Sequence, residues 1–171
     1  WVDGDQSYRI RPNKNVLKNR TKQNNKNLFS GQIDEPLYGS TYLPRKFKCA
    51  VTVPGDNSVD ILTNDIGLVA FSKSNGKLQG CNVYVGGGMG RTHNNEETFA
   101  RSAEALGYVE ANDVLNLVQS ILALQRDYGD RKLRRHARMK YLIEAQGINW
   151  FKTKLTDSYF KKELQALKKE P

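Results

Sequence analysis

The spacing of apolar residues differs between the two halves of this chain, and this difference limits the folds it can adopt. In the first half, residues 46–53 alternate and end in β-branched side chains, and residues 67–71 and 78–85 are short apolar runs. Each of these segments is predicted to be a strand. The dipeptide Asn75-Gly76 favours a tight turn, so the second and third strands are predicted to form an antiparallel hairpin.

Helical spacing dominates the second half. Residues 113–128 carry apolar side chains at intervals of three and four, with Asn112 or Asp113 as a candidate cap and Gly129 as a stop. Further helices are predicted over 96–106, over 133–146 and from about residue 149, and the amphipathic tail from residue 161 is a candidate for another. Strands followed by helices predict an α+β fold with a mixed, largely antiparallel sheet packed with helices.

The length of 171 residues fits one domain with a sizeable core. The chain starts at Trp1 without a signal-peptide pattern, and we interpret it as a piece of a longer polypeptide or a processed product. We divide it into a basic, Asn/Lys-rich and mostly flexible segment over 1–36, a folded domain over 37–160, and a basic tail or linker over 161–171. No apolar stretch is long enough for a membrane span, so we expect no membrane partner.

Charge indicates the class of partner. Lys and Arg number 27 against 18 Asp and Glu, which gives a net charge of +9. Such an excess favours nucleic acid, an acidic protein, an anionic cofactor or a small oxyanion. The basic segment over 11–27 would suit a nucleic-acid-binding arm, but it lacks aromatic residues for base stacking, which favours a solvated insertion instead.

Two lysines near the first predicted strand are candidates for anion binding. Lys46 and Lys48 would point to one face of that strand and Phe47 to the other. The two ammonium groups repel each other, so this face is either open to water or occupied by an anion such as a phosphate or a sulfite-like oxyanion.

A glycine-rich run follows the third predicted strand. Gly86, Gly87, Gly88, Met89 and Gly90 lack the Lys-Ser/Thr ending of a phosphate-binding loop and the spacing of a dinucleotide fingerprint. Consecutive glycines cost chain entropy. We therefore interpret the run as either an irregular turn or a place where bare main chain approaches a large flat or anionic ligand.

The remaining reactive side chains show no catalytic spacing. Residues 131–140 contain six basic side chains, and on a helix Arg131, Arg134 or Arg135, and Arg138 would align. The two histidines, His93 and His136, and the two cysteines, at positions 49 and 81, lack the spacing of a metal site. From the residues alone, the chain is an anion- or cofactor-binding α+β domain with no assigned reaction.

Several motifs in order resemble one enzyme family. The motifs are YLPRKFK at 42–48, VPGDNSVD at 53–60, NVYVGGGMGRTH at 82–93, ETFAR at 97–101, QRDYG at 125–129 and RHARMKY at 135–141. Together they resemble the assimilatory sulfite reductases, most closely the ferredoxin-dependent type of cyanobacteria and plastids. The resemblance covers residues 37–154 and corresponds to the first half of such enzymes.

The resemblance implies a function and a set of site residues. These enzymes reduce sulfite to sulfide by six electrons at a sirohaem bridged to a 4Fe-4S cluster. It implies that Lys46 and Lys48 are catalytic and face sulfite, and that Arg138 contacts a sirohaem carboxylate. The other cofactor-binding residues expected are Arg45, Gly86, Gly87, Gly88, Met89, Gly90, Arg91, His93 and Arg134. It also implies sulfite, ferredoxin and the missing C-terminal half of the polypeptide as partners, in the cytoplasm or the plastid stroma.

Departures from the family pattern limit these expectations. The four cluster cysteines are absent, so we expect no metal ligands here, no cofactor bound to the fragment alone and no activity from it. One alternative is a fragment of a ferredoxin–nitrite reductase, in which asparagine usually replaces the second lysine, so Lys48 favours sulfite. The other alternative is a non-catalytic basic module that binds nucleic acid, with DNA as its partner.

Overall fold

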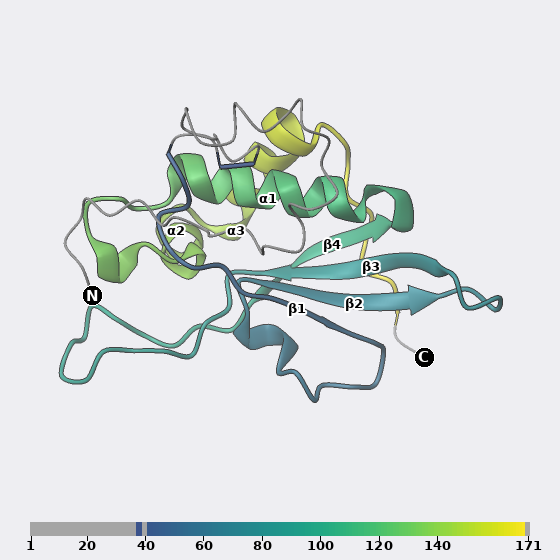
Figure 1. Ribbon diagram of the computed structural model, residues 1–171, viewed down its shortest axis with the longest axis horizontal. Coiled ribbons are helices and arrows are strands. Elements are labelled where there is room, and N and C mark those ends of the chain that lie inside the picture. The colour runs from purple at the N-terminus through teal and green to yellow at the C-terminus, as the bar shows by residue number, and fades with distance from the viewer. Residues whose placement is uncertain (1–36, 39–40, 170–171) are drawn as a thin grey trace, which may run out of the picture. The chain divides into compact units, whose positions relative to one another are not determined.

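The computed structural model describes residues 37–38 and 41–169, all of which belong to one compact unit (Figure 1). The expectation of a flexible segment over 1–36 concerns residues outside this part, as do the last two residues of the predicted tail. The strands are β1 (Cys49–Thr52), β2 (Ile66–Ser72), β3 (Leu78–Val85) and β4 (Glu104–Glu110). The helices are α1 (Val114–Tyr128), α2 (Met139–Gln146) and α3 (Ile148–Lys154). These elements confirm the predicted α+β class.

The four strands form one mixed sheet in the order β1-β2-β3-β4. The β2–β3 and β3–β4 pairs are antiparallel, and β1 is parallel to β2. The predicted hairpin is therefore confirmed, with Ile66 at the start of β2 opposite Val85 at the end of β3. Because the glycine-rich run follows Val85 directly, this register places it beside the start of β2.

The helices cover one face of the sheet (Figure 1). Every second residue of β2 and β3 points toward them, because successive side chains of a strand alternate between its faces. The buried cluster between the layers contains Ile66, Leu68, Val83, Val85, Leu117, Ile121, Leu124, Met139, Ile143, Phe151 and Leu155. Full burial of each large apolar side chain contributes about 1.5–3 kcal/mol, so this cluster is the main source of stability.

The opposite face is covered only in part. A single 3₁₀ turn at Ile61–Thr63 and the last described residues pack on it. Gln165 pairs with Tyr108 through two main-chain hydrogen bonds, of 2.9 and 3.1 Å. The side-chain amide of Asn82 exchanges two hydrogen bonds of 2.8 Å with the main chain of Lys168. These contacts hold the C-terminal stretch extended across the sheet, so the helix considered for the tail from residue 161 is wrong over 161–169.

The helix predicted over 96–106 is also wrong. Residues 91–103 form an irregular loop, and β4 begins at Glu104. Arg101 exchanges main-chain hydrogen bonds of 2.7 and 3.0 Å with Gly88, and the N–H of Ala103 donates to the carbonyl oxygen of Leu62. Because these main-chain groups pair across the loop, they are not available for a helix.

Two further boundaries differ from prediction. β1 covers only Cys49–Thr52, so Lys46 and Lys48 lie in the extended segment before it. The helix predicted over 133–146 exists only as α2, preceded by a 3₁₀ turn at Arg134–His136. The expected helical alignment of the arginines in 131–140 is therefore wrong. Stacking cations along one helix face would be unfavourable, because like charges three or four residues apart on a helix repel each other.

Within the described residues, no helix combines the length and apolar character needed to cross a bilayer.

Candidate functional site

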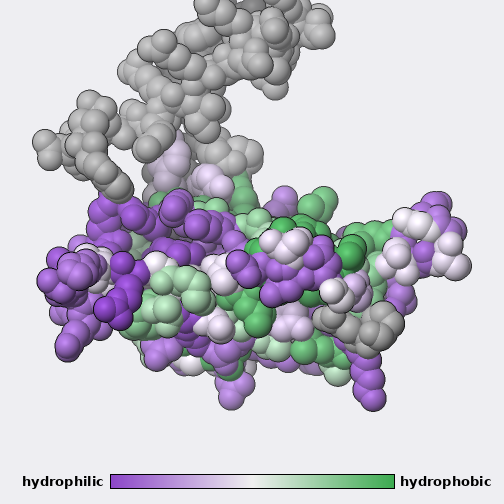
Figure 2. Space-filling model, turned by 90° about the horizontal axis from the view of Figure 1, so that it is seen from below, coloured by the Kyte–Doolittle hydropathy of each residue, from purple (hydrophilic) through white to green (hydrophobic). Residues whose placement is uncertain are grey.

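A cleft of about 630 Å³ opens at the end of the sheet where the glycine-rich run leaves β3. Eight of its fourteen lining residues are cations, and no carboxylate is among the described residues that line it. We call it the basic cleft. It is lined by Arg45, Lys46, Lys48, Thr63, Met89, Gly90, Arg91, Thr92, Thr98, Arg134, Arg135, Arg138, Lys140 and Tyr141. In the view from below, hydrophilic side chains are most abundant toward one end of the molecule, and others occur at the opposite end and along the face between (Figure 2).

Three segments that are distant in sequence form the walls of the basic cleft. Residues 45–48 approach from the N-terminal side of β1, residues 89–98 belong to the loop between β3 and β4, and residues 134–141 lead into α2. The fold therefore brings Lys46, Lys48 and Arg138 to one cavity. Such a concentration of cations in a concave site favours an anionic ligand.

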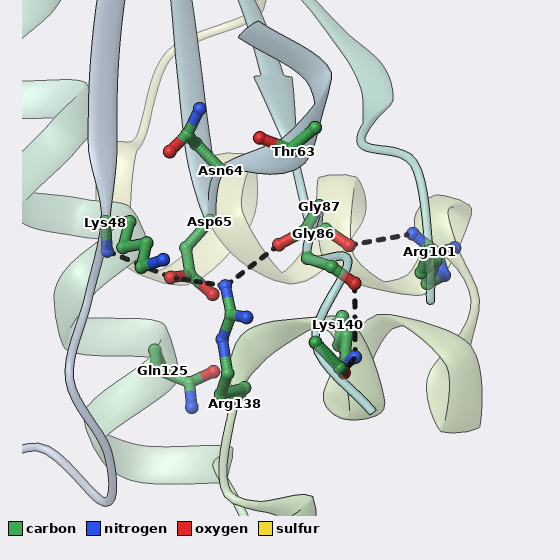
Figure 3. Close-up of polar contacts among 12 residues, drawn as sticks. Lys48, Thr63, Asn64, Asp65, Gly86, Gly87, Arg101, Gln125, Arg138 and Lys140 are labelled. Atoms are coloured by element: carbon green, nitrogen blue, oxygen red, sulfur yellow. Dashed lines mark hydrogen bonds and ion pairs between the residues drawn. The ribbon is translucent and has the colours of Figure 1, made fainter. Parts of the chain in front are cut away.

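Arg138 is held at the base of the basic cleft. Its Nη2 donates to Asp65 Oδ2 at 3.0 Å and to the carbonyl oxygen of Gly87 at 3.1 Å (Figure 3). Asp65 is 1% exposed, and the same Oδ2 accepts the main-chain N–H of Lys48 at 2.9 Å. One buried carboxylate oxygen therefore contacts both the segment that carries the lysines and the arginine on the opposite wall.

The three consecutive glycines are packed against protein. A Cβ on Gly86 would lie 2.6 Å from Ile143, one on Gly87 would lie 2.1 Å from the carbonyl oxygen of Leu62, and one on Gly88 would lie 2.6 Å from Nη1 of Arg138. Packing within the domain thus accounts for the absence of side chains at 86–88. A Cβ on Gly90 would meet no atom within 4 Å, so Gly90 lies against the open cleft.

Lys140 is a buried cation in the wall of the basic cleft, with 1% of the residue exposed. Its Nζ donates to the carbonyl oxygens of Gly88 at 3.1 Å, Gly90 at 2.8 Å and Phe99. The same ammonium lies 4.9 Å from the ring centroid of Tyr141, within the range of a cation–π contact. Burial and the neighbouring Arg138 charge lower the pKa of Lys140, whereas Asp65 opposes this shift.

The structure brings together most, but not all, of the residues predicted for the site. Arg45, Lys46, Lys48, Met89, Gly90, Arg91, Arg134 and Arg138 line the basic cleft. Gly86, Gly87 and Gly88 lie behind its wall and are buried. His93 is exposed and is not among the lining residues. The other histidine, His136, stacks on Tyr141 with 4.7 Å between ring centroids.

Several lining residues were not among the predicted site residues. Thr63, Thr92, Thr98, Arg135, Lys140 and Tyr141 also line the basic cleft, and of these Arg135 had been considered as an alternative to Arg134 in the basic run. Lys140 and Arg135 lie within the basic run at 131–140, which was the available signal. The hydroxyls and Asp65 gave no comparable signal, because only the fold brings them to the cleft.

The side chains present suit one of the two groups that the sequence suggested. A poly-carboxylate cofactor such as sirohaem fits the basic cleft, because guanidinium and ammonium groups are the donors that bind carboxylates. A 4Fe-4S cluster does not fit, because neither cysteine lines the cleft, and Cys49 is exposed while Cys81 is buried. The described residues contain no cluster of three or more His, Cys, Asp or Glu that could hold a metal ion.

The sequence of this chain is similar to one protein family and to several known enzymes. The family described as "Nitrite and sulphite reductase 4Fe-4S domain" matches residues 22–164. A sulfite reductase [ferredoxin] of Synechococcus elongatus is 54% identical over 100% of this chain and 27% of its own length. The sulfite reductase [NADPH] subunit beta of Saccharomyces cerevisiae is 43% identical over 95% of this chain and 12% of its own length.

A solved structure supports the same grouping at the level of the fold. The Mycobacterium tuberculosis NirA protein aligns with a TM-score of 0.62 and 29% identity, over 75% of this chain and 22% of that protein. The chain therefore spans about a quarter or less of each of these proteins.

Proposed function

Because the chain belongs to the nitrite and sulphite reductase 4Fe-4S domain family, we propose that it is the anion-binding part of a sulfite reductase. The observation that carries this proposal is the basic cleft, whose lining combines Lys46 and Lys48 on one wall with Arg138 on another. The relatives named above as sulfite reductases support sulfite as the substrate. Lys48 supports it further, since nitrite reductases usually carry asparagine at this point of the motif.

The cations of the basic cleft would serve two kinds of anion. Arg45, Arg91, Arg134 and Arg138 would bind the carboxylates of sirohaem, with Met89 and Gly90 against the macrocycle. Lys46 and Lys48 would bind sulfite. When bound, the sirohaem with its 4Fe-4S cluster would supply the electrons for reduction, and ligands for the cluster would come from outside the described residues.

The two lysines would contribute electrostatics and protons. An anion in the basic cleft is attracted by the ammonium groups on its wall. An ammonium within hydrogen-bond reach of a sulfite oxygen can also donate one of the two protons with which that oxygen leaves as water. Both lysines are exposed to the cleft, so their ammonium groups can reach a bound ligand.

We infer further partners from the same relationship. A ferredoxin is the proposed electron donor, because the Synechococcus elongatus relative is named for it and an acidic protein would pair with a basic surface. The remainder of the polypeptide would complete the enzyme, and the chain alone would be inactive. We expect the enzyme in the cytoplasm or the plastid stroma.

Substitution of the two lysines in the full-length enzyme tests the proposal. Lys46→Met and Lys48→Met are each expected to lower sulfite turnover per sirohaem at least about tenfold, because general acid catalysis contributes factors of this size or more. Lys77→Met, on the exposed β2–β3 turn, is the matched control and should keep wild-type turnover. Sirohaem content is measured from its absorption band. Wild-type sulfite kinetics in both cleft variants would refute the proposal, and higher activity with nitrite than with sulfite would favour the alternative.

A further inference from the structure

We propose that Asp65 is a positioning residue that sets where Lys48 and Arg138 lie in the basic cleft, an inference that rests on the proposed function. Asp65 is 1% exposed and precedes β2, so it does not contact the ligand itself. Its Oδ2 accepts the Lys48 N–H at 2.9 Å and an Arg138 N–H at 3.0 Å (Figure 3). A single oxygen atom therefore couples the two walls.

The main chain of Lys48 is fixed on both sides by residues 65 and 66. Its N–H donates to the Asp65 carboxylate, and its carbonyl oxygen accepts the N–H of Ile66 at 3.0 Å. Because both polar groups of the Lys48 peptide backbone are held, the direction in which its side chain leaves the chain is also fixed. The ammonium of Lys48 thus starts from a defined point on the cleft wall.

Arg138 is fixed from the opposite side. Its guanidinium donates hydrogen bonds to Asp65 and to the carbonyl oxygen of Gly87. The guanidinium also lies close to the position that a Cβ would occupy at residue 88. The main chain before β2 also holds the glycine-rich run, since the Gly86 and Gly87 N–H groups donate to the carbonyl oxygens of Asp65 and Asn64, both at 3.0 Å. Residues 64–65 are therefore linked directly to two walls of the basic cleft, and to the third through the glycine-rich run that leads into it.

The geometry is not the one that stability alone would favour. An arginine–carboxylate pair usually forms two parallel hydrogen bonds. Here Oδ1 of Asp65 and Nε of Arg138 are both buried without a hydrogen-bond partner among the described residues. Buried polar atoms without partners cost stability. In return, a single atom, Asp65 Oδ2, holds the Lys48 amide and the Arg138 guanidinium at a fixed separation.

Removal of the charge on Asp65 should lower turnover without weakening the binding of sulfite. Asp65→Asn makes the basic cleft more positive by one charge, so attraction of sulfite is maintained or strengthened. The charge-assisted hydrogen bonds to Lys48 and Arg138 are weakened at the same time. We expect a KM for sulfite that is unchanged or lower, and a kcat per sirohaem that is about tenfold lower or more. A general loss of folded protein would lower sirohaem content instead.

The kinetic test is a double-mutant cycle in the full-length enzyme. If Asp65 acts through Lys48, adding Asp65→Asn to Lys48→Met lowers kcat little beyond the Lys48→Met value. Asp127→Asn is the matched control, because Asp127 also pairs with an arginine, Arg126 at 2.6 Å, and does not line the cleft. It should keep wild-type kcat. A kcat per sirohaem for Asp65→Asn within twofold of wild type, or two effects that multiply independently, would overturn the inference.

A measurement without turnover complements the cycle. Amide hydrogen exchange at Lys48 should be several-fold faster in Asp65→Asn, while peptides from α1 keep their wild-type exchange. Unchanged exchange at Lys48 would overturn the inference even in a variant that binds no sirohaem. If Lys48→Met keeps full sulfite turnover, the proposed function fails at that residue, and the exchange experiment still decides whether Asp65 fixes the Lys48 main chain.

Discussion

The ammonium of Lys140 lies 2.8 Å from the carbonyl oxygen of Gly90, inside the wall of the basic cleft. The same group also donates to the carbonyl oxygens of Gly88 and Phe99. Among the described residues no carboxylate forms an ion pair with it. Lys140 therefore acts as an internal cation that holds an irregular loop in place through main-chain oxygens.

Substitution of Lys140 should destabilise the chain strongly. Lys140→Met keeps the apolar stem but removes the ammonium donor from three carbonyl oxygens, of which only that of Gly88 is also bonded to the Arg101 N–H. The expected loss in free energy of unfolding is about 3 kcal/mol or more. Urea unfolding followed by circular dichroism measures this loss. Lys73→Met, at an exposed position, is the control and should change stability by less than about 0.5 kcal/mol. Equal midpoints for the two variants would contradict the structural role of Lys140.

Alanine substitutions at two glycines of the glycine-rich run, Gly87 and Gly90, should have different effects on stability. A Cβ at position 87 would lie 2.1 Å from the Leu62 carbonyl oxygen, a main-chain atom that cannot move aside cheaply, so Gly87→Ala should cost about 3 kcal/mol or more. At Gly90 there is open space, and Gly90→Ala should be neutral or slightly stabilising, since alanine restricts the unfolded chain. Thermal unfolding of both variants measures the difference. Similar transition temperatures would argue against the packing of Gly87.

A tyrosine on the helical layer should make stability depend on alkaline pH. The Tyr159 hydroxyl donates to Asp127 Oδ2 at 2.8 Å. Burial, followed by this hydrogen bond, raises the pKa of Tyr159 above its ordinary value. The folded state therefore holds the phenolic proton more tightly, so its contribution is complete below pH 10 and declines as the pH rises further.

The variant Tyr159→Phe tests this dependence. It should lose about 1 kcal/mol at pH 7, and the difference from wild type should shrink above pH 10. Unfolding curves at pH 7, 9 and 10.5 provide the comparison. Tyr128→Phe, in the adjacent ring that contacts Tyr159, serves as the control, and it should keep both the Tyr159–Asp127 hydrogen bond and the alkaline decline in stability that Tyr159 causes. A constant difference across this pH range would contradict the prediction.

Binding of DNA should not involve the two cleft lysines. They line a concave site, so a duplex would not bring its phosphates against them. We therefore expect the slope of log affinity against log salt concentration to be unchanged in a Lys46→Met/Lys48→Met variant. A slope reduced by about two would show that both lysines contact phosphates, and it would support the nucleic-acid alternative.

Local sequence patterns predicted those parts of the fold that local interactions determine. β3 has the predicted bounds, and α1 begins one residue after the predicted start, because alternation and helical spacing are strong in both segments. β4 was missed because its strand character depends on pairing with β3 and on the contact between Tyr108 and Gln165. Non-local pairing overrides local propensity in such segments.

In the candidate site, too, the residues with a local sequence signal were predicted, and those placed only by the fold were not. Lys46, Lys48 and Arg138 were predicted from their charges and motifs, and the fold brings them to one cleft. Asp65 could not be assigned from the sequence, because an isolated acid has no distinctive pattern. For Lys140 the only signal was its place in the basic run at 131–140, which does not distinguish it from its neighbours. Their contacts join segments as far apart as residues 48, 65, 88 and 138.

The parallel pairing of β1 with β2 has a consequence for the order of folding. The β2–β3 hairpin closes through a short turn, whereas β1 reaches β2 only through the long connection over residues 53–65. Contacts that close longer loops form later on average, because more chain entropy is lost. We therefore expect β1 to pair with β2 after the hairpin has closed, so an early intermediate that contains only the hairpin would not yet have brought Lys46 and Lys48 to the ligand.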